Sequence, residues 1–165
     1  RPALHRVGIG FDIHRLKRGR PFVLAGGRIP HASGPDGHSD ADPLSHAVVD
    51  ALLGAAALGD IGEHFPEASP RWRGTSGPEF LRRTLALLAG AGWRPVNVDA
   101  TVFCERPKLG PHKRAVEAAL ARALGLPASA VNVKAKTMEG LGPVGTGKAL
   151  AAQAVASLAR APGQG

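Results

Sequence analysis

One segment constrains the fold more than any other, the stretch that begins at Asp42-Pro43. Asp caps the free amides at a helix start, and Pro has no amide to leave unpaired at the first helical position. The residues that follow have the i, i+3, i+4 spacing of an apolar helical stripe: Leu44, Ala47, Val48, Ala51, Leu52 and Ala55. The segment therefore predicts a helix from Asp42 to about Ala55.

Strand and helix patterns alternate along the rest of the chain. Strands are predicted over 4–13, 96–102 and 131–136, with a hairpin over 22–29 that turns at Gly26-Gly27. Further helices are predicted over 78–89 and 111–124, and loops over 31–37, 59–77 and 140–147. The Ala-rich residues 148–160 have helical propensity. Without a linker or a repeat, these patterns predict a single compact domain, α/β in class and α+β in type. We expect a mixed β-sheet with the helices packed on one face.

The length, the cysteine content and the apolar runs of the chain indicate its domain count and its cellular compartment. A chain of 165 residues corresponds to one domain, here residues 1–160 with a flexible tail at 161–165. Its single cysteine, Cys104, excludes an internal disulfide and favours a reducing compartment, the cytoplasm. No apolar run approaches the roughly 18 residues that a membrane-spanning helix needs. We therefore expect no membrane partner.

The net charge of +8 suits an anionic partner, either nucleic acid or a phosphorylated small molecule. Nucleic-acid binders commonly interleave basic residues with aromatic side chains that stack on bases. This chain has no Tyr, five Phe and two Trp, and its basic residues are dispersed. A phosphorylated small molecule is therefore favoured, and no nucleic-acid partner is expected.

The first chemical motif is Asp12-Ile13-His14, at the end of the first predicted strand. Residues i and i+2 of a strand point to the same face, so this carboxylate and this imidazole emerge side by side. His46, in the first turns of the predicted helix, offers a third ligand, and Asp50 is one turn further on, where it could orient an imidazole. Two imidazoles and a carboxylate make a zinc set with an open fourth position, as in catalytic sites.

Two competing motifs carry less weight. Asp36, Asp40 and Asp42 have the wrong spacing for a calcium loop, and no Glu follows at the bidentate position. The segment from Gly142 to Lys148 matches G-x-x-x-x-G-K but has Ala149 where a P-loop needs Ser or Thr for Mg²⁺. Only 17 residues follow Lys148, and none is Asp or Glu. A P-loop nucleotide binder is therefore disfavoured.

Two further segments suit phosphate chemistry. Thr137-Met138-Glu139 ends a predicted strand, where a hydroxyl and a carboxylate can serve a hard cation and phosphate oxygens, or simply a turn. Pro107-Lys108 follows another strand and can present an ammonium group to phosphate.

Taken together, these segments resemble the 2-C-methyl-D-erythritol 2,4-cyclodiphosphate synthase family over residues 6–158. The matching motifs occur in this order: Gly10-Phe11-Asp12-Ile13-His14, His38-Ser39-Asp40-Ala41-Asp42, His46, 50–55, 58–62, Phe65-Pro66, 106–109 and 134–139. The resemblance implies a homotrimer with active sites between subunits. It also implies that the Ala-rich C-terminal segment is a strand, and we follow it against propensity, since tertiary context overrides propensity.

The family implies an intramolecular reaction of 4-diphosphocytidyl-2-C-methyl-D-erythritol 2-phosphate that gives the cyclodiphosphate and CMP. By the same resemblance, Asp12, His14 and His46 hold Zn²⁺, Glu139 holds a second ion (Mg²⁺ or Mn²⁺), and His38 and Thr137 stabilise the transition state. Of these six residues, all but His46 are also implied substrate contacts. The other implied substrate contacts are Ser39, Asp60, Ile61, Gly62, Phe65, Pro66, Glu67, Ser69, Cys104, Pro107, Lys108, Leu109, Lys136 and Met138.

The reaction is reasonable on physical grounds. The nucleophile is a phosphate oxygen that is mostly dianionic at neutral pH, so no general base is required. What the protein must supply is charge neutralisation and in-line alignment of two phosphoryl groups. A catalytically silent phosphate-binding module on the same fold is the alternative, but every metal and phosphate position named above is filled.

Overall fold

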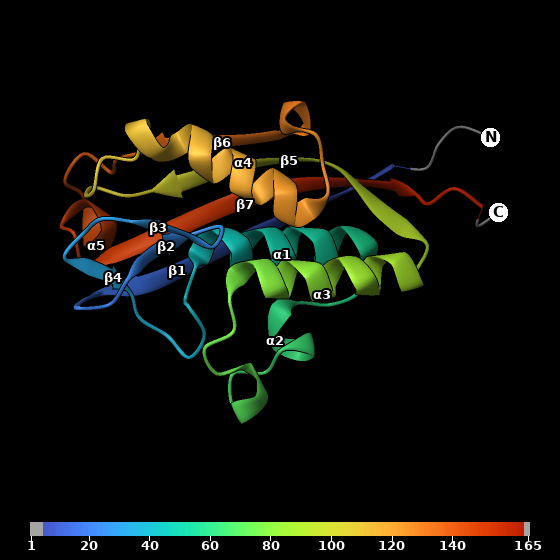
Figure 1. The fold of residues 1–165 in the computed structure, drawn as a ribbon, viewed down its shortest axis with the longest axis horizontal. Helices are drawn as coiled ribbons and strands as arrows, with labels where there is room; N and C mark the ends of the chain where they lie inside the picture. The colour runs from blue at the N-terminus through green and yellow to red at the C-terminus, as the bar shows by residue number, and fades with distance from the viewer. Residues whose placement is uncertain (1–4, 164–165) are drawn as a thin grey trace.

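The computed structural model describes residues 5–163 as one domain built on a long, twisted sheet (Figure 1). The strands are β1 (His5–Arg18), β2 (Phe22–Leu24), β3 (Gly27–Ile29), β4 (Ser33–Pro35), β5 (Trp93–Phe103), β6 (Val131–Lys136) and β7 (Ala149–Arg160). The helices are α1 (Pro43–Ala56), α2 (Ile61–His64), α3 (Gly77–Gly90), α4 (Lys113–Leu124) and α5 (Gly142–Gly145). Three short 3₁₀ turns lie at Pro70–Trp72, Gly110–His112 and Ala128–Ala130. No helix in this part of the chain has the length and apolar character to cross a bilayer.

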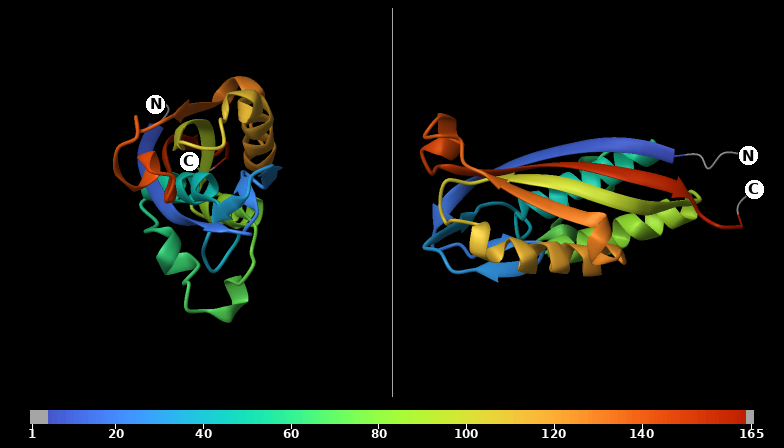
Figure 2. Two further views of the ribbon diagram at one scale, coloured as in Figure 1. Left: turned by 90° about the vertical axis from the view of Figure 1, so that its left-hand side faces the viewer. Right: turned by 90° about the horizontal axis from the view of Figure 1, so that it is seen from above.

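The main sheet has the strand order β4-β1-β7-β5-β6. Only β5 and β6 run parallel; the other neighbours are antiparallel. The helices α1, α3 and α4 lie on one face, so sheet and helices form two layers (Figures 1 and 2). The predicted mixed sheet with helices on one face is confirmed for these three helices. The one-turn α5 is the exception, because Val144 packs on the other face against Phe103, Ala149 and Ala151.

The C-terminal segment is a central strand and not a helix. β7 pairs with β1 on one side and with β5 on the other, so its backbone groups have hydrogen-bond partners on both edges of the strand. Ala152, Ala154 and Ala156 are fully buried on the helix side, where their small side chains let α1 approach the sheet. Tertiary pairing therefore outweighs the helical propensity of Ala.

The predicted elements appear with shifted ends. The hairpin turns at Ala25-Gly26, both with positive φ, and not at Gly26-Gly27, because Leu24 pairs directly with Gly27. β1 continues to Arg18, and the loop predicted at 31–37 contains β4. The loop predicted at 59–77 contains α2 and a 3₁₀ turn. Residues 1–4, and 164–165 of the predicted tail, lie outside the described residues.

The face of the sheet away from the long helices is apolar along β1. Val7, Ile9, Phe11 and Ile13 alternate on this face and are between 45% and 68% exposed. On β5 and β6 the same face is polar, with Asp99 bonded to Lys134 at 2.7 Å and to Asn132 at 3.0 Å. The exposed row on β1 is larger than the scattered apolar residues of an ordinary monomer surface.

Candidate metal centre and substrate pocket

The packing of α1 on β1 brings together the three residues of the first predicted motif. Gly8 and Gly10 face α1, and a Cβ on either would collide with the backbone carbonyls of Ala51 and Ala47, respectively. Two and four residues beyond Gly10 on the same face are Asp12 and His14. Asp42 caps α1 by accepting from the amides of Leu44 (3.1 Å) and Ser45 (3.2 Å), which fixes where the helix starts.

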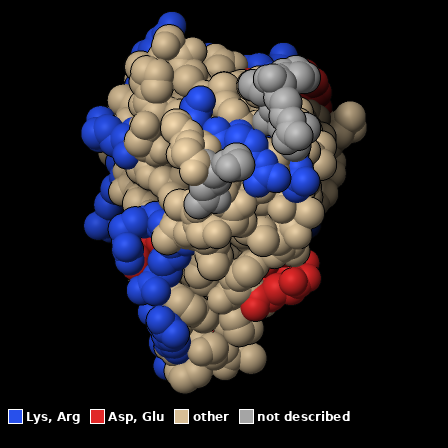
Figure 3. Space-filling model, turned by 90° about the vertical axis from the view of Figure 1, so that its right-hand side faces the viewer, with Lys and Arg blue, Asp and Glu red and all other residues tan. Residues whose placement is uncertain are grey.

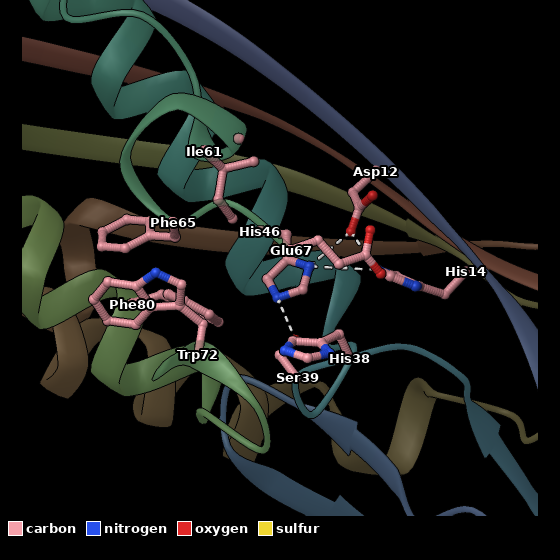
Figure 4. Close-up of a pocket in the computed structure, with 11 residues that line it drawn as sticks. Asp12, His14, His38, Ser39, His46, Ile61, Phe65, Glu67, Trp72 and Phe80 are labelled. Atoms are coloured by element: carbon pink, nitrogen blue, oxygen red, sulfur yellow. Dashed lines mark hydrogen bonds and ion pairs between the residues drawn. The ribbon is translucent and has the colours of Figure 1, made fainter. Parts of the chain in front are cut away.

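The resulting cluster is tight (Figure 4). Oδ2 of Asp12 lies 2.8 Å from Nε2 of His14 and 3.0 Å from Nδ1 of His46. The two imidazole nitrogens are 3.4 Å apart. One possible ligand atom from each residue lies within 4.8 Å of those from the other two. Within residues 5–163, no other group of three or more His, Cys, Asp or Glu side chains is this close together.

Each imidazole is held from its far side. Nδ1 of His14 donates to the carbonyl oxygen of Asp36 at 3.0 Å, which leaves Nε2 directed at the cluster. Nε2 of His46 lies 3.2 Å from Oγ of Ser39, which leaves Nδ1 directed at the cluster. Outer partners of this kind orient metal-binding histidines. Asp50 does not have the predicted orienting role, because its carboxylate accepts from the amide of Ile61 at 2.7 Å.

The electrostatics of the cluster favour the ionised pair. Burial opposes ionisation of Asp12, but hydrogen bonds with His14 and His46 outweigh it and lower the pKa of the carboxyl. Burial likewise opposes the charged form of His14, but the hydrogen bond to Asp12, the negative charge of Asp12 and smaller contributions from Asp36 and Asp42 together outweigh burial and raise the pKa of the ring. A carboxylate with two inward-facing ring nitrogens is a donor set that Zn²⁺ accepts, so the residues fit the predicted metal.

A cavity of about 220 Å³ opens beside this cluster. Ile61, Phe65, Trp72 and Phe80 form its apolar wall, and the ring of His46 packs edge-on against Phe80 (Figure 4). The remaining lining residues are Asp12, His14, His38, Ser39, His46, Gly62 and Glu67. Trp72 and Phe80 were not among the predicted site residues, and the only sequence signal for them is their aromatic character close to Phe65.

The other residues predicted around this pocket lie at its border. Nε2 of His38 donates to the carbonyl oxygen of Ser69 at 3.3 Å, which ties two predicted segments together. Asp60 caps α2 by accepting from the amide of Glu63 at 3.0 Å. Asp60, Pro66 and Ser69 do not line the cavity in the single chain.

The second group of predicted residues forms a separate cluster at the same end of the sheet. The carboxylate of Glu105 accepts from the amide of Met138, which joins segment 104–109 to segment 136–139. Cys104 and Leu109 are buried, whereas Lys108, Lys136, Thr137 and Glu139 are exposed. Glu139 follows β6, and its carboxylate is not among the ligand atoms of the Asp12 cluster. Its neighbour Met138 shares a pocket with Phe11 and Ile13, which lie on the opposite face of the sheet from Asp12.

The G-x-x-x-x-G-K segment does not form a P-loop. A P-loop leads from a strand into a helix whose amides bind phosphate. Here Gly142–Gly145 form one helical turn, and Lys148 leads into strand β7. Its carbonyl oxygen accepts from the amide of Leu16.

Comparison with known proteins bears directly on this arrangement. The model of the YgbB family matches residues 5–159. The chain belongs to the YgbB family. Among the curated relatives of this YgbB-family chain, the 2-C-methyl-D-erythritol 2,4-cyclodiphosphate synthase of Bordetella petrii is 54% identical, over 94% of the chain and 96% of the relative. The synthase of Salinibacter ruber is 52% identical, over 93% and 98%.

Solved structures of related synthases have the same fold as this chain. A 2C-methyl-D-erythritol-2,4-cyclodiphosphate synthase in a CDP-bound form superposes with a TM-score of 0.86 at 42% identity, covering 93% of this chain and 99% of that one. The bifunctional IspDF of Campylobacter jejuni superposes with a TM-score of 0.92 at 35% identity. This YgbB-family chain covers 43% of that bifunctional protein and nearly all of the single-function relatives.

Proposed function

We propose that this chain is a 2-C-methyl-D-erythritol 2,4-cyclodiphosphate synthase, a lyase of non-mevalonate isoprenoid biosynthesis. It converts 4-diphosphocytidyl-2-C-methyl-D-erythritol 2-phosphate to the cyclodiphosphate and CMP. The observation that carries the proposal is the Asp12, His14 and His46 cluster beside a half-apolar cavity, in a chain with full-length synthase relatives. The single buried Cys104 supports a reducing compartment, the cytoplasm.

In the proposed reaction an oxygen of the 2-phosphate attacks the β-phosphoryl group, and CMP leaves. The attacking phosphate is mostly dianionic at neutral pH and needs no general base from the protein. His38 lines the cavity, where it positions a phosphoryl oxygen. Thr137 belongs to the second cluster and contacts the phosphates from there. The apolar wall made by Ile61, Phe65 and Trp72 receives the carbon chain and excludes water that would hydrolyse the diphosphate.

Two divalent ions complete the proposed site. Asp12, His14 and His46 would hold Zn²⁺, and Glu139 would hold Mg²⁺ or Mn²⁺. When bound, such ions neutralise the charge of two phosphoryl groups held close together. Segment 104–109 and the residues Lys136 and Met138 next to it would take the cytidine and its phosphates.

We further propose a homotrimer in which each active site lies between two chains. Two observations support this assembly. The exposed apolar row on β1 requires cover in water. Within one chain Glu139 is also not part of the Asp12 cluster, and its neighbour Met138 lies against the opposite face of β1. In a cyclic, head-to-tail assembly the second cluster of one subunit can complete the first cluster of the next.

Complementation between inactive variants tests activity and assembly together. His46→Ala and Glu139→Ala should each abolish CMP release while the fold is retained by circular dichroism. After the two variants are co-refolded in equal amounts, about a quarter of the sites should combine an intact His46 with an intact Glu139 from the neighbour. Recovery of about a quarter of wild-type activity is the expected result. No recovery would argue against shared sites, and full activity of either variant alone would overturn the assigned residues.

A further inference from the structure

The segment from Pro35 to Ser39 connects both histidines of the metal centre. Its Asp36 carbonyl oxygen accepts from Nδ1 of His14, and its Ser39 hydroxyl lies 3.2 Å from Nε2 of His46. Gly37 lies close to the ring of His14, since a Cβ added to Gly37 would be 3.3 Å from two of the ring atoms. His38, between them, faces the cavity. The conformation of these five residues therefore sets the directions of three imidazoles.

The guanidinium of Arg20 donates hydrogen bonds to three backbone carbonyl oxygens of this segment. Its Nε donates to the carbonyl oxygen of Pro35 at 3.2 Å, and its Nη2 donates to those of Gly37 at 3.3 Å and Ser39 at 3.4 Å. These three carbonyl oxygens belong to alternate residues of the segment. The carbonyl oxygen of the intervening Asp36 instead accepts from Nδ1 of His14. One guanidinium thus holds the backbone of the segment that contacts the metal centre.

We propose that Arg20 is a positioning residue of the metal centre, which acts through segment 35–39 to hold His14 and His46 in their ligand orientations and His38 in the cavity. The inference deepens the proposed function, since it rests on Asp12, His14 and His46 binding a metal ion. Arg20 itself contacts none of the three proposed ligands.

Arg20 holds the segment mainly through the shape of its guanidinium, which makes three hydrogen bonds, and less through its charge. The ion pair between Arg20 and Asp36 has a separation of 3.7 Å, and both side chains are at least one-third exposed. Such a pair contributes little to stability in water. Three carbonyl oxygens in a row instead match the flat, forked donor of Arg, which the single ammonium of Lys cannot reproduce. Arg20→Lys should therefore weaken the metal centre almost as much as Arg20→Ala does.

Four variants separate these contributions. Arg20→Ala removes both fork and charge, and Arg20→Lys removes the fork alone. Arg18→Ala removes a charge two residues away on the exposed end of β1, and Asp36→Asn removes the ion pair while its backbone carbonyl stays. Only the two Arg20 variants should affect the metal centre.

The first measurement needs no metal. Backbone amide order parameters for residues 36–39 of the metal-free protein, from ¹⁵N NMR relaxation, should be about 0.85 in the wild type and in the Arg18→Ala and Asp36→Asn controls. They should fall below about 0.6 in both Arg20 variants, while the amides of α1 and β1 stay rigid. A segment that stays equally rigid without Arg20 overturns the proposal.

The second measurement is the zinc dissociation constant, obtained by competition with a chelator. Both Arg20 variants should bind zinc about 10- to 100-fold more weakly than the wild type, and both controls should stay within about threefold of it. Unchanged affinity in Arg20→Ala overturns the proposal. If the wild type itself binds no zinc, the metal centre of the proposed function fails, and the order parameters alone decide whether Arg20 holds the segment.

Discussion

Gly10 of β1 lies directly against the backbone carbonyl of Ala47 in α1. A Cβ at position 10 would overlap that oxygen, and the neighbouring atoms are backbone and cannot turn aside. The missing side chain lets α1 lie close enough to the sheet for His46 to reach Asp12 at 3.0 Å. The spacing of the metal centre therefore depends on a glycine that touches none of its ligands.

Gly10→Ala should lower the free energy of unfolding by about 1–3 kcal/mol or more, because overpacking against backbone forces α1 away from β1. It should also weaken zinc binding, because the helix carries His46. Urea denaturation and chelator competition measure the two effects. Gly54→Ala in α1 is the matched control, since no atom lies within 4 Å of its added Cβ. That control should gain about 0.5–1 kcal/mol from helix propensity, and equal behaviour of the two variants would contradict the packing argument.

Ser39→Ala should weaken zinc binding by about tenfold or more, because the imidazole of His46 loses the hydroxyl on its far nitrogen. Asp50→Asn should have a much smaller effect, since Asp50 bonds to the amide of Ile61. Isothermal titration of the metal-free proteins with zinc compares them. A larger loss in Asp50→Asn than in Ser39→Ala would restore the orienting role that the sequence suggested for Asp50.

The buried cap Asp42 should make stability depend on pH. Burial, with the nearby charge of Asp40, raises the pKa of its carboxyl from 3.8 to about 6. Between these values the folded state binds more protons than the unfolded state, so the contribution of Asp42 to stability is fully present below about pH 4 and is lost as the pH rises through about 6. The slope is at most about 1.4 kcal/mol per pH unit.

Asp42→Asn removes this titration. The difference in unfolding free energy between wild type and variant, measured in a chelator from pH 4 to 7, should shift in favour of the variant as the pH rises. A difference that stays constant across the range would show that Asp42 titrates normally.

Cys104 should react slowly with alkylating reagents. Burial raises the pKa of its thiol to about 11, although the carbonyl oxygen of Arg106 accepts from it at 3.1 Å. At pH 8 only about one-thousandth of the thiol is then ionised. Mass spectrometry should find little iodoacetamide adduct on the native protein and rapid labelling in guanidinium. Equal rates in both conditions would place the thiol in an open loop.

The sequence predicted the elements of this fold better than their positions relative to one another. Asp42-Pro43 marked the start of α1 to within a residue, because capping is local chemistry. The Asp12, His14 and His46 set was predictable because strand parity and the first helical turn each fix a direction. The strand predicted for 148–160 from the family resemblance is confirmed. Propensity alone indicated a helix there, because no local signal reports that β7 has a strand on each side.

The partners of the ligands were the least predictable part. Asp36 acts through its backbone carbonyl and Arg20 through contacts with other carbonyls, so neither role depends on a recognisable motif. Helical spacing made Asp50 a reasonable candidate for orienting His46, but its carboxylate accepts a hydrogen bond from the amide of Ile61 in α2. The sequence indicated a net charge of +8 with dispersed basic residues, and on the face drawn in Figure 3 Lys and Arg lie along the left-hand edge and across the upper part, with neutral areas between them.

The hydrogen bonds that join Asp12, His14 and His46 bear on whether the chain folds before or after it binds a metal ion. Oδ2 of Asp12 bonds to both imidazoles, so the three side chains stabilise one another without an ion. Zinc-finger domains, by contrast, are unfolded until they bind their metal. We therefore expect this chain to fold before it binds a metal ion, so that under the proposed function the metal supply limits how many molecules are active and not how many are folded.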